Sequence, residues 1–346
     1  MRSARIAFAA GLMLVAPGCQ GPGVARREIP EDPIAFIFHP EDEARRRAEV
    51  YAKRATPEPR SGLEVPTVVQ LNRFRDYLEQ TFGSRADDEF AGRLSLLNPR
   101  SRQVTVLESA RKGAIPLVWS PDRDRLLFAQ RELGKLQLFE YQRDSRVVSQ
   151  ITAGPDHHPQ GCYGPGGRLI AVVAKRAGST EDRTGGGKLV SRIALMGPGD
   201  AVESISPGPT DGEPACSPDG TAVAYVRLFS DARSEIWIHS FADEEPARAI
   251  VQGREPSFSP DGEWIVYSRV VGKTPALWRV RRDGSGRTRL GRGSGADEYG
   301  PAVSPDGSLV VYESVFGNRY RLFVRRFDGT GDSVLFSDGD GTHAVW

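Results

Sequence analysis

The stretch Cys216-Ser217-Pro218-Asp219-Gly220, followed by the apolar run Val223–Val226, decides the fold because it recurs along the chain. Ser-Pro-Asp-Gly begins again at residues 259 and 304, and weaker copies begin at 120 (Ser-Pro-Asp-Arg) and 164 (Gly-Pro-Gly-Gly). Proline presets φ for the first central position of a turn, aspartate tolerates the second, and glycine supplies the left-handed residue that follows. Each copy therefore predicts a tight turn between two strands.

The copies follow one another at a spacing of about 45 residues, the period of a β-propeller blade. An apolar residue precedes each turn, and a β-branched or aromatic run follows it. Abundant Gly (38) and Pro (25), spread along the chain, suit many short strands joined by turns. Six inner strands are expected, ending at these residues: Trp119, Tyr163, Cys216, Phe258, Val303 and Trp346. Of these, Trp119, Phe258 and Trp346 are predicted to pack between blades.

The two ends of the chain are predicted to share one blade. His343–Trp346 matches a first strand, whereas 34–38 reads as a second strand with no first strand before it. Residues 94–97 and 104–107 supply the third and fourth strands. Joining both ends in one sheet removes an exposed edge and fastens the ring.

A helical insertion, 41–92, interrupts this closing blade. Glu41–Arg54 is charged and helical in character, and Pro66 opens a second segment with apolar residues on one face. The predicted fold class is therefore all-β: a six-bladed β-propeller over 34–346, with a helical insertion in the blade that closes the ring.

The blade pattern resembles the TolB-type, WD-repeat-like propellers of bacterial envelopes. The resemblance covers about residues 94–346 and, through closure, 34–38. It implies an envelope protein that binds other proteins, including peptidoglycan-associated ones, at its loops and channel mouth without catalysis. TolB proteins also carry an N-terminal α/β domain, for which this chain leaves no room, so we expect a family relative and not a TolB.

The first residues have the features of a secretory signal. Arg2 and Arg5 precede an apolar run, 6–15, which is too short to span a bilayer. Cys19 follows directly and resembles a lipoprotein processing site, so we expect a signal peptide over 1–18, lipidation of Cys19 and a linker over 19–33. Gln20 then favours attachment to the outer membrane from the periplasm. The alternative is an ordinary cleaved signal.

Charge and motifs exclude several function classes. Lys plus Arg (46) balances Asp plus Glu (45), which argues against a nucleic-acid binder. The chain has no Gly-x-Ser-x-Gly elbow, Walker loop or His-Glu-x-x-His. We therefore expect no catalytic residues and a non-enzymatic binding scaffold. The alternative is a metal-dependent lyase or carbohydrate-binding propeller with its site in the central channel.

Two cysteines remain after Cys19. Cys162 and Cys216 are both expected on inner strands of neighbouring blades. An oxidising compartment permits a bridge between them, but two cysteines are no disulfide framework, and we expect small buried apolar side chains.

Candidate ligand residues come from the position just before each inner strand, where the loops meet the channel. The set is Ile115, His158, Glu213, Glu255, Gly300 and His343, with His157, Asp297 and Glu298 close by in sequence. Imidazoles and carboxylates together suit a divalent metal such as Zn²⁺ or Mn²⁺, or a polar ligand, and no other cofactor is expected. The candidates are thus His158, Glu213, Glu255 and His343; the alternative is that these loops are polar because they are solvated.

Overall fold

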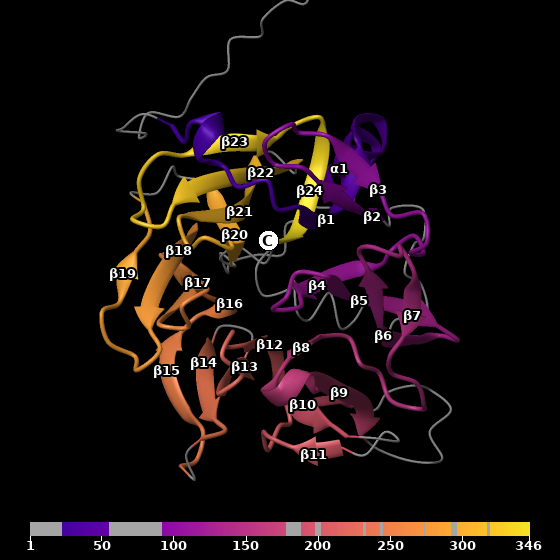
Figure 1. Cartoon of the computed structure of the whole chain (residues 1–346), viewed down its shortest axis with the longest axis vertical. Coiled ribbons are helices and arrows are strands. Elements are labelled where there is room, and N and C mark those ends of the chain that lie inside the picture. Colours follow the sequence, from indigo (N-terminus) through magenta and orange to yellow (C-terminus); the bar gives the residue numbers. More distant parts are fainter. Residues whose placement is uncertain are drawn as a thin grey trace, which may run out of the picture.

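A computed structural model describes residues 23–54, 92–177, 188–197, 202–230, 233–242, 245–272, 274–291, 296–316 and 319–346. These residues form six four-stranded antiparallel sheets arranged as blades around a central axis (Figure 1). The predicted six-bladed propeller is therefore confirmed.

The blades are numbered by the order of their inner strands, and the strands of each blade are named from the inside outwards. Blade 1 holds β4 (Ile115–Trp119), β5 (Arg125–Glu132), β6 (Lys135–Gln142) and β7 (Val148–Gln150). Blade 2 holds β8 (Gly161–Tyr163), β9 (Leu169–Ala177), β10 (Lys188–Met196) and β11 (Val202–Ser204). Blade 3 holds β12 (Asp211–Cys216), β13 (Ala222–Ser230), β14 (Arg233–Ser240) and β15 (Arg248–Gln252).

The other three blades follow the same scheme. Blade 4 holds β16 (Arg254–Phe258), β17 (Trp264–Val271), β18 (Thr274–Arg281) and β19 (Thr288–Arg289). Blade 5 holds β20 (Asp297–Val303), β21 (Leu309–Phe316), β22 (Arg319–Arg326) and β23 (Ser333–Phe336). Blade 6 holds β24 (Gly339–Val345), β1 (Ile34–Pro40), β2 (Arg93–Leu97) and β3 (Val104–Val106).

Each motif turn is held by its own serine and aspartate. In blade 4, Ser259 Oγ donates to Asp261 Oδ1 (2.5 Å) and accepts from the backbone N–H of Trp264 (3.0 Å). Asp261 Oδ1 also accepts from the N–H of Glu263 (3.0 Å), and Gly262 takes the left-handed φ of 72°. These bonds hold the pKa of Asp261 below its ordinary value, the bond from Ser259 contributing most. The turn residues are thus structural, as their chemistry predicts.

Because the strands are antiparallel, the blades have two distinct ends. The motif turns, which join first to second strands, lie at one end, called the turn face. The hairpins that join second to third strands lie at the other end, called the insertion face because helix α1 (Glu41–Arg54) follows β1 there. The inner strands begin at the insertion face and run towards the turn face.

Blade 6 closes the ring as predicted from the two chain ends. β1 pairs with β24 on its inner side and with β2 on its outer side, with Ala35 opposite Val345 and Phe36 opposite Ser95. Trp346 is buried in a cluster that includes Ile34 and Phe36. Trp119 and Phe258 are also buried in clusters between neighbouring blades, as predicted.

The insertion and the N-terminal segment both lie against the propeller. Helix α1 coincides with the predicted first helix, and Glu41 bonds Arg319 of β22 (2.7 Å), while the second predicted helix lies outside the described residues. The predicted linker, 19–33, is packed on the propeller from residue 23 onwards: Val24 and Ile29 are buried and Glu28 pairs with Arg326 (2.9 Å). The two apolar side chains explain this difference, since their burial favours docking.

Candidate functional site

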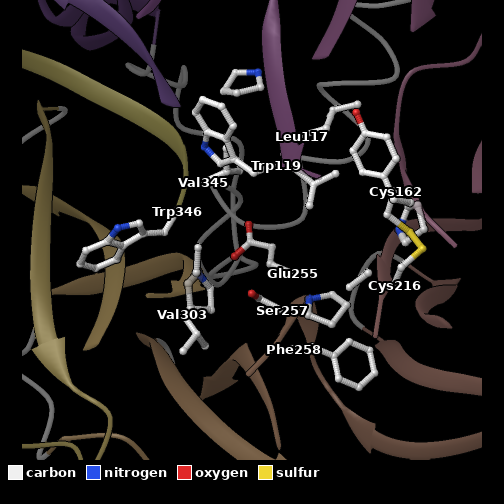
Figure 2. Close-up of a pocket in the computed structure, with 18 of the residues that line it drawn as sticks. Leu117, Trp119, Cys162, Cys216, Glu255, Ser257, Phe258, Val303, Val345 and Trp346 are labelled. Carbon is white, nitrogen blue, oxygen red and sulfur yellow. A yellow bond between two sulfur atoms is a disulfide. The ribbon is translucent and has the colours of Figure 1, made fainter. Parts of the chain in front are cut away.

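The inner strands enclose a central cavity of about 500 Å³. Its wall is apolar over much of its depth, and Figure 2 shows the oxygen atoms of Glu255 and Ser257 in its middle, with Trp119, Val303 and Trp346 around them. Prolines line it at two levels, because one lies at or directly after the ring position of several blades and another belongs to the motif turn. They are Pro116, Pro214, Pro256, Pro301, Pro121, Pro218, Pro260 and Pro305.

Near the insertion face, four of the six inner strands share an unusual backbone conformation. Glu213, Glu255 and His343 have positive φ angles of 51°, 55° and 54°, and Gly300 has 52°. Each of these residues lies at an irregularity in the pairing of its strand with the next strand of the blade. A non-glycine residue in this region costs about 1–3 kcal/mol, so the surrounding structure must hold it there.

What holds these residues is a relay of hydrogen bonds from blade to blade. The amide oxygen of Gln160 accepts from the N–H of Glu213 (2.8 Å), and Glu213 Oε2 accepts from the N–H of Glu255 (2.7 Å). Glu255 Oε2 then accepts from the N–H of Gly300 (2.7 Å). The relay therefore joins blades 2, 3, 4 and 5 at one level of the cavity.

The relay passes from blade 5 to blade 6 by a different residue. Gly300 has no side chain, and Glu313 of β21 instead accepts from the N–H of His343 (2.6 Å). In blade 1 the same offset from the motif turn places Pro116, and not the expected Ile115, at this position, and proline has no N–H to donate. The relay therefore ends at blade 6, because blade 1 has no N–H at this position to continue it.

The relay carboxylates also bind side chains. Glu213 Oε1 pairs with the guanidinium of Arg254 (2.5 Å), and both side chains are largely buried. Glu255 Oε2 accepts from Ser268 Oγ (2.7 Å). These acidic groups are thus engaged in tying blades together, which is a structural task.

The structure brings three of the four candidates to the cavity. Glu213, Glu255 and His343 line it, and so do Ile115 and Gly300. The placement of His158 at this ring was wrong: its Nδ1 lies 3.0 Å from Gln137 Oε1 of β6, and the ring position of blade 2 is held by Gln160. The irregular segment before β8 shifts the strand start by two residues relative to the expectation.

The neighbouring polar residues lie elsewhere. His157 Nδ1 accepts from the N–H of Leu136 (3.2 Å), and Asp297 Oδ2 accepts from the hydroxyl of Tyr299 (3.1 Å). Glu298 forms an ion pair with Arg325 (2.6 Å), each side chain being 1% exposed. In the part of the chain that the structure describes, no three His, Cys, Asp or Glu residues are grouped so that they can hold a metal ion.

Sequence reasoning missed Gln160 and Glu313. Counting back four residues from the first residue of each motif gives Pro116, Gln160, Glu213, Glu255 and Gly300. A fixed offset from the turn therefore finds the relay position, whereas the start of a strand does not. Glu313 carries no such signal, because it replaces the missing side chain of Gly300 from a neighbouring strand.

Cys162 and Cys216 form a disulfide between β8 and β12. The expectation of two separate apolar side chains was therefore wrong. The inner strands of blades 2 and 3 lie side by side, which brings the two sulfur atoms together at the cavity wall, as Figure 2 shows.

Comparison with solved structures identifies the architecture. TolB from Acinetobacter baumannii superposes with a TM-score of 0.61 at 17% identity, covering 92% of this chain and 68% of that one. The TolB-type protein from Agrobacterium tumefaciens gives 0.57 at 20% identity, covering 72% of this chain and 90% of that one. The chain has the TolB-like propeller fold.

The same TolB-like propeller also resembles part of the hydrazine synthase of Kuenenia stuttgartiensis, with a TM-score of 0.62 at 11% identity, covering 91% of this chain and 46% of that one. The sequence matches no protein-family model and no curated protein. At these identities the likeness of the TolB-like propeller to its neighbours concerns the fold, and function must come from the site.

Proposed function

We propose that this protein is a non-catalytic binding scaffold of the bacterial cell envelope. It lies in the periplasm and is attached to the outer membrane by a lipid on Cys19. Its loops and channel mouth dock envelope proteins, including peptidoglycan-associated ones. The observation that carries the proposal is the rigid ring whose cavity carboxylates are engaged between blades. Acidic groups used in this way stabilise the ring on which the loops are presented.

The insertion face supplies a suitable docking surface. Leu133, Phe229 and Val270 are exposed there, by 94%, 49% and 50%, each at the hairpin between the second and third strands of its blade. Helix α1 follows the same connection in blade 6. These side chains belong to blades 1, 3 and 4, and we propose that they contribute contacts to the docked protein.

The disulfide supports a location outside the cytoplasm. Disulfides persist in oxidising compartments such as the periplasm and are rare where thiols are kept reduced. Among the described residues, no helix is long and apolar enough to cross a membrane. The proposed attachment is the lipid on Cys19.

Site-specific photo-crosslinking in intact cells tests the docking proposal. A benzophenone amino acid placed at Leu133 or Phe229 should give the same discrete protein adduct. The matched control is Val147, which is 53% exposed at the β6–β7 turn on the turn face and should not give that adduct. Identical products from all three positions, or no protein adduct from Leu133 and Phe229, would contradict the proposal.

Membrane fractionation tests the anchor separately. The wild-type protein should sediment with outer membranes, and Cys19→Ala should be released as soluble protein, because stable retention needs the acyl chains. If the two proteins are distributed equally between the fractions, a lipid on Cys19 does not hold the protein at the membrane.

The alternative is a metal-dependent lyase or carbohydrate-binding propeller. No observation on the described residues favours it. Zn²⁺ or Mn²⁺ should raise the melting temperature if a site exists, since a ligand of the native state stabilises it by mass action. His343→Ala tests whether such a shift comes from the cavity.

A further inference from the structure

Arg123 departs from the pattern of the motif turns. It holds the position that glycine holds in the turns at Gly220, Gly262 and Gly307, with the same left-handed conformation: φ is 66° against 69°, 72° and 73°. Its N–H donates to Ser120 O (2.8 Å), as the glycines do in their own turns. An arginine therefore occupies a backbone position that disfavours side chains, although glycine serves the same turn in three other blades.

The side chain of Arg123 lies at the cavity. It lines the cavity together with Trp119 and Pro121, and the centre of its guanidinium group lies 5.3 Å from the centre of the Trp119 ring. Nε and Nη2 are buried and, within the described part of the chain, no hydrogen-bond acceptor satisfies them. Burial lowers the pKa of Arg123 to about 10, opposed by the charge of Asp32, so the group remains a cation at neutral pH.

A partly buried cation with two covered, unused donors is costly unless an acceptor completes it. Guanidinium nitrogens match the paired oxygens of a carboxylate or phosphate, and the indole and proline beside them suit an apolar body. We propose that Arg123 is the anion-binding residue of a ligand site at the turn-face mouth of the cavity, which takes a carboxylate or phosphate attached to an apolar group. This site lies at the opposite end of the cavity from the proposed docking face, and it does not depend on the proposed function.

Calorimetric titration of the wild-type protein tests the site with three probes of the same body. Phenylacetate and phenyl phosphate carry the two anionic heads, and phenylacetamide carries an uncharged one. At least one anion should bind saturably and at least about tenfold more tightly than the amide, because hydrogen bonds to charged groups are the strong ones. Which anion binds more tightly identifies the head group. Equal binding of all three probes, or binding of none, would overturn the proposal.

Two glycine variants separate ligand binding from turn strain. Arg123→Gly restores the residue of the other turns and should fold, but its affinity for the anion should fall at least about tenfold. The matched control is Arg146→Gly, because Arg146 also has a positive φ (58°) but is exposed in the β6–β7 turn, away from the cavity. The control should bind as the wild type does. Unchanged affinity in Arg123→Gly, with both variants folded by circular dichroism, would overturn the proposal.

Discussion

At the scale of single residues, Glu255 joins two blades through one carboxylate. Its Oε2 accepts from Gly300 of blade 5 and from Ser268 of its own blade, while its N–H donates to Glu213 of blade 3. Removing the carboxylate leaves the N–H of Gly300 without this acceptor, and an unsatisfied buried donor is more costly than a lost exposed bond.

We therefore expect Glu255→Ala to lower the free energy of unfolding by about 1–3 kcal/mol. Glu255→Gln should lose less, because its amide oxygen can still accept from Gly300. Urea denaturation followed by tryptophan fluorescence measures both changes. Glu263→Ala is the control in the same blade, since the Glu263 side chain is 67% exposed and should cost little. A loss for Glu255→Ala no larger than the control would show that the relay is not stabilising.

The sequence predicts which residues face the cavity, but it does not predict the hydrogen bonds that these residues form. Glu213, Glu255 and His343 follow from their common place in the repeat, whereas the bonds that employ the two glutamates cross from blade to blade. Repeat alignment describes each blade alone and carries no information on such contacts. Arg123 was visible in the sequence as an imperfect motif, but its burial depends on the fold of blade 1.

At the scale of elements, helix α1 is tied to blade 5 by an ion pair. Arg319 Nη2 lies 2.7 Å from Glu41 Oε2, and its Nε lies 2.7 Å from Asp340 of β24. The hydrogen bond from Arg319 lowers the pKa of Glu41 from 4.5 to about 2. A carboxyl with a lowered pKa stabilises the native state above its ordinary pKa, and this contribution is lost as the pH falls through the native value.

The wild type should accordingly melt at a higher temperature than Glu41→Gln above about pH 4.5, and the difference should shrink between about pH 4.5 and pH 2. Melting curves of both proteins across this range measure it. Glu43→Gln, in the same first turn of α1, controls for the general charge of the helix terminus. A difference that does not depend on pH would mean that the ion pair with Arg319 does not stabilise the native state.

The disulfide joins two neighbouring elements, β8 and β12, across the boundary between blades 2 and 3. We expect the double variant Cys162→Ala/Cys216→Ala to unfold with about 2–4 kcal/mol less free energy than the oxidised wild type. Reductant should bring the wild type to the stability of the variant, which controls for the change in side-chain packing. Two reactive thiols in the denatured, unreduced wild type would disprove the bridge.

At the scale of the whole molecule, the ring depends on a short strand far from its partner in sequence. Deleting His343–Trp346 should remove much of the inner partner of β1 and the buried Trp346. Loss of a buried tryptophan typically costs about 3–5 kcal/mol, a large share of the stability of a domain. The truncated protein should melt earlier and less cooperatively in calorimetry, and a wild-type midpoint and width would contradict this expectation.

Closure could be predicted from sequence because the two chain ends lack complementary parts of one repeat. The docking of 23–33 could not, since Val24 and Ile29 are two apolar residues without periodicity, and only the finished surface of the propeller gives them a place to pack. The repeat therefore predicts the fold, but it does not predict the contacts of segments that lie outside the repeat.

The pairing of β1 with β24 also sets the order of events while the chain is being made. β1 comes early in the chain, whereas its inner neighbour β24 comes late. The backbone groups on the inner edge of β1 therefore have no strand to pair with until β24 is present. An unpaired strand edge of this kind invites association with other chains. The final step of ring formation should therefore be slow, because it joins the most distant segments of the chain.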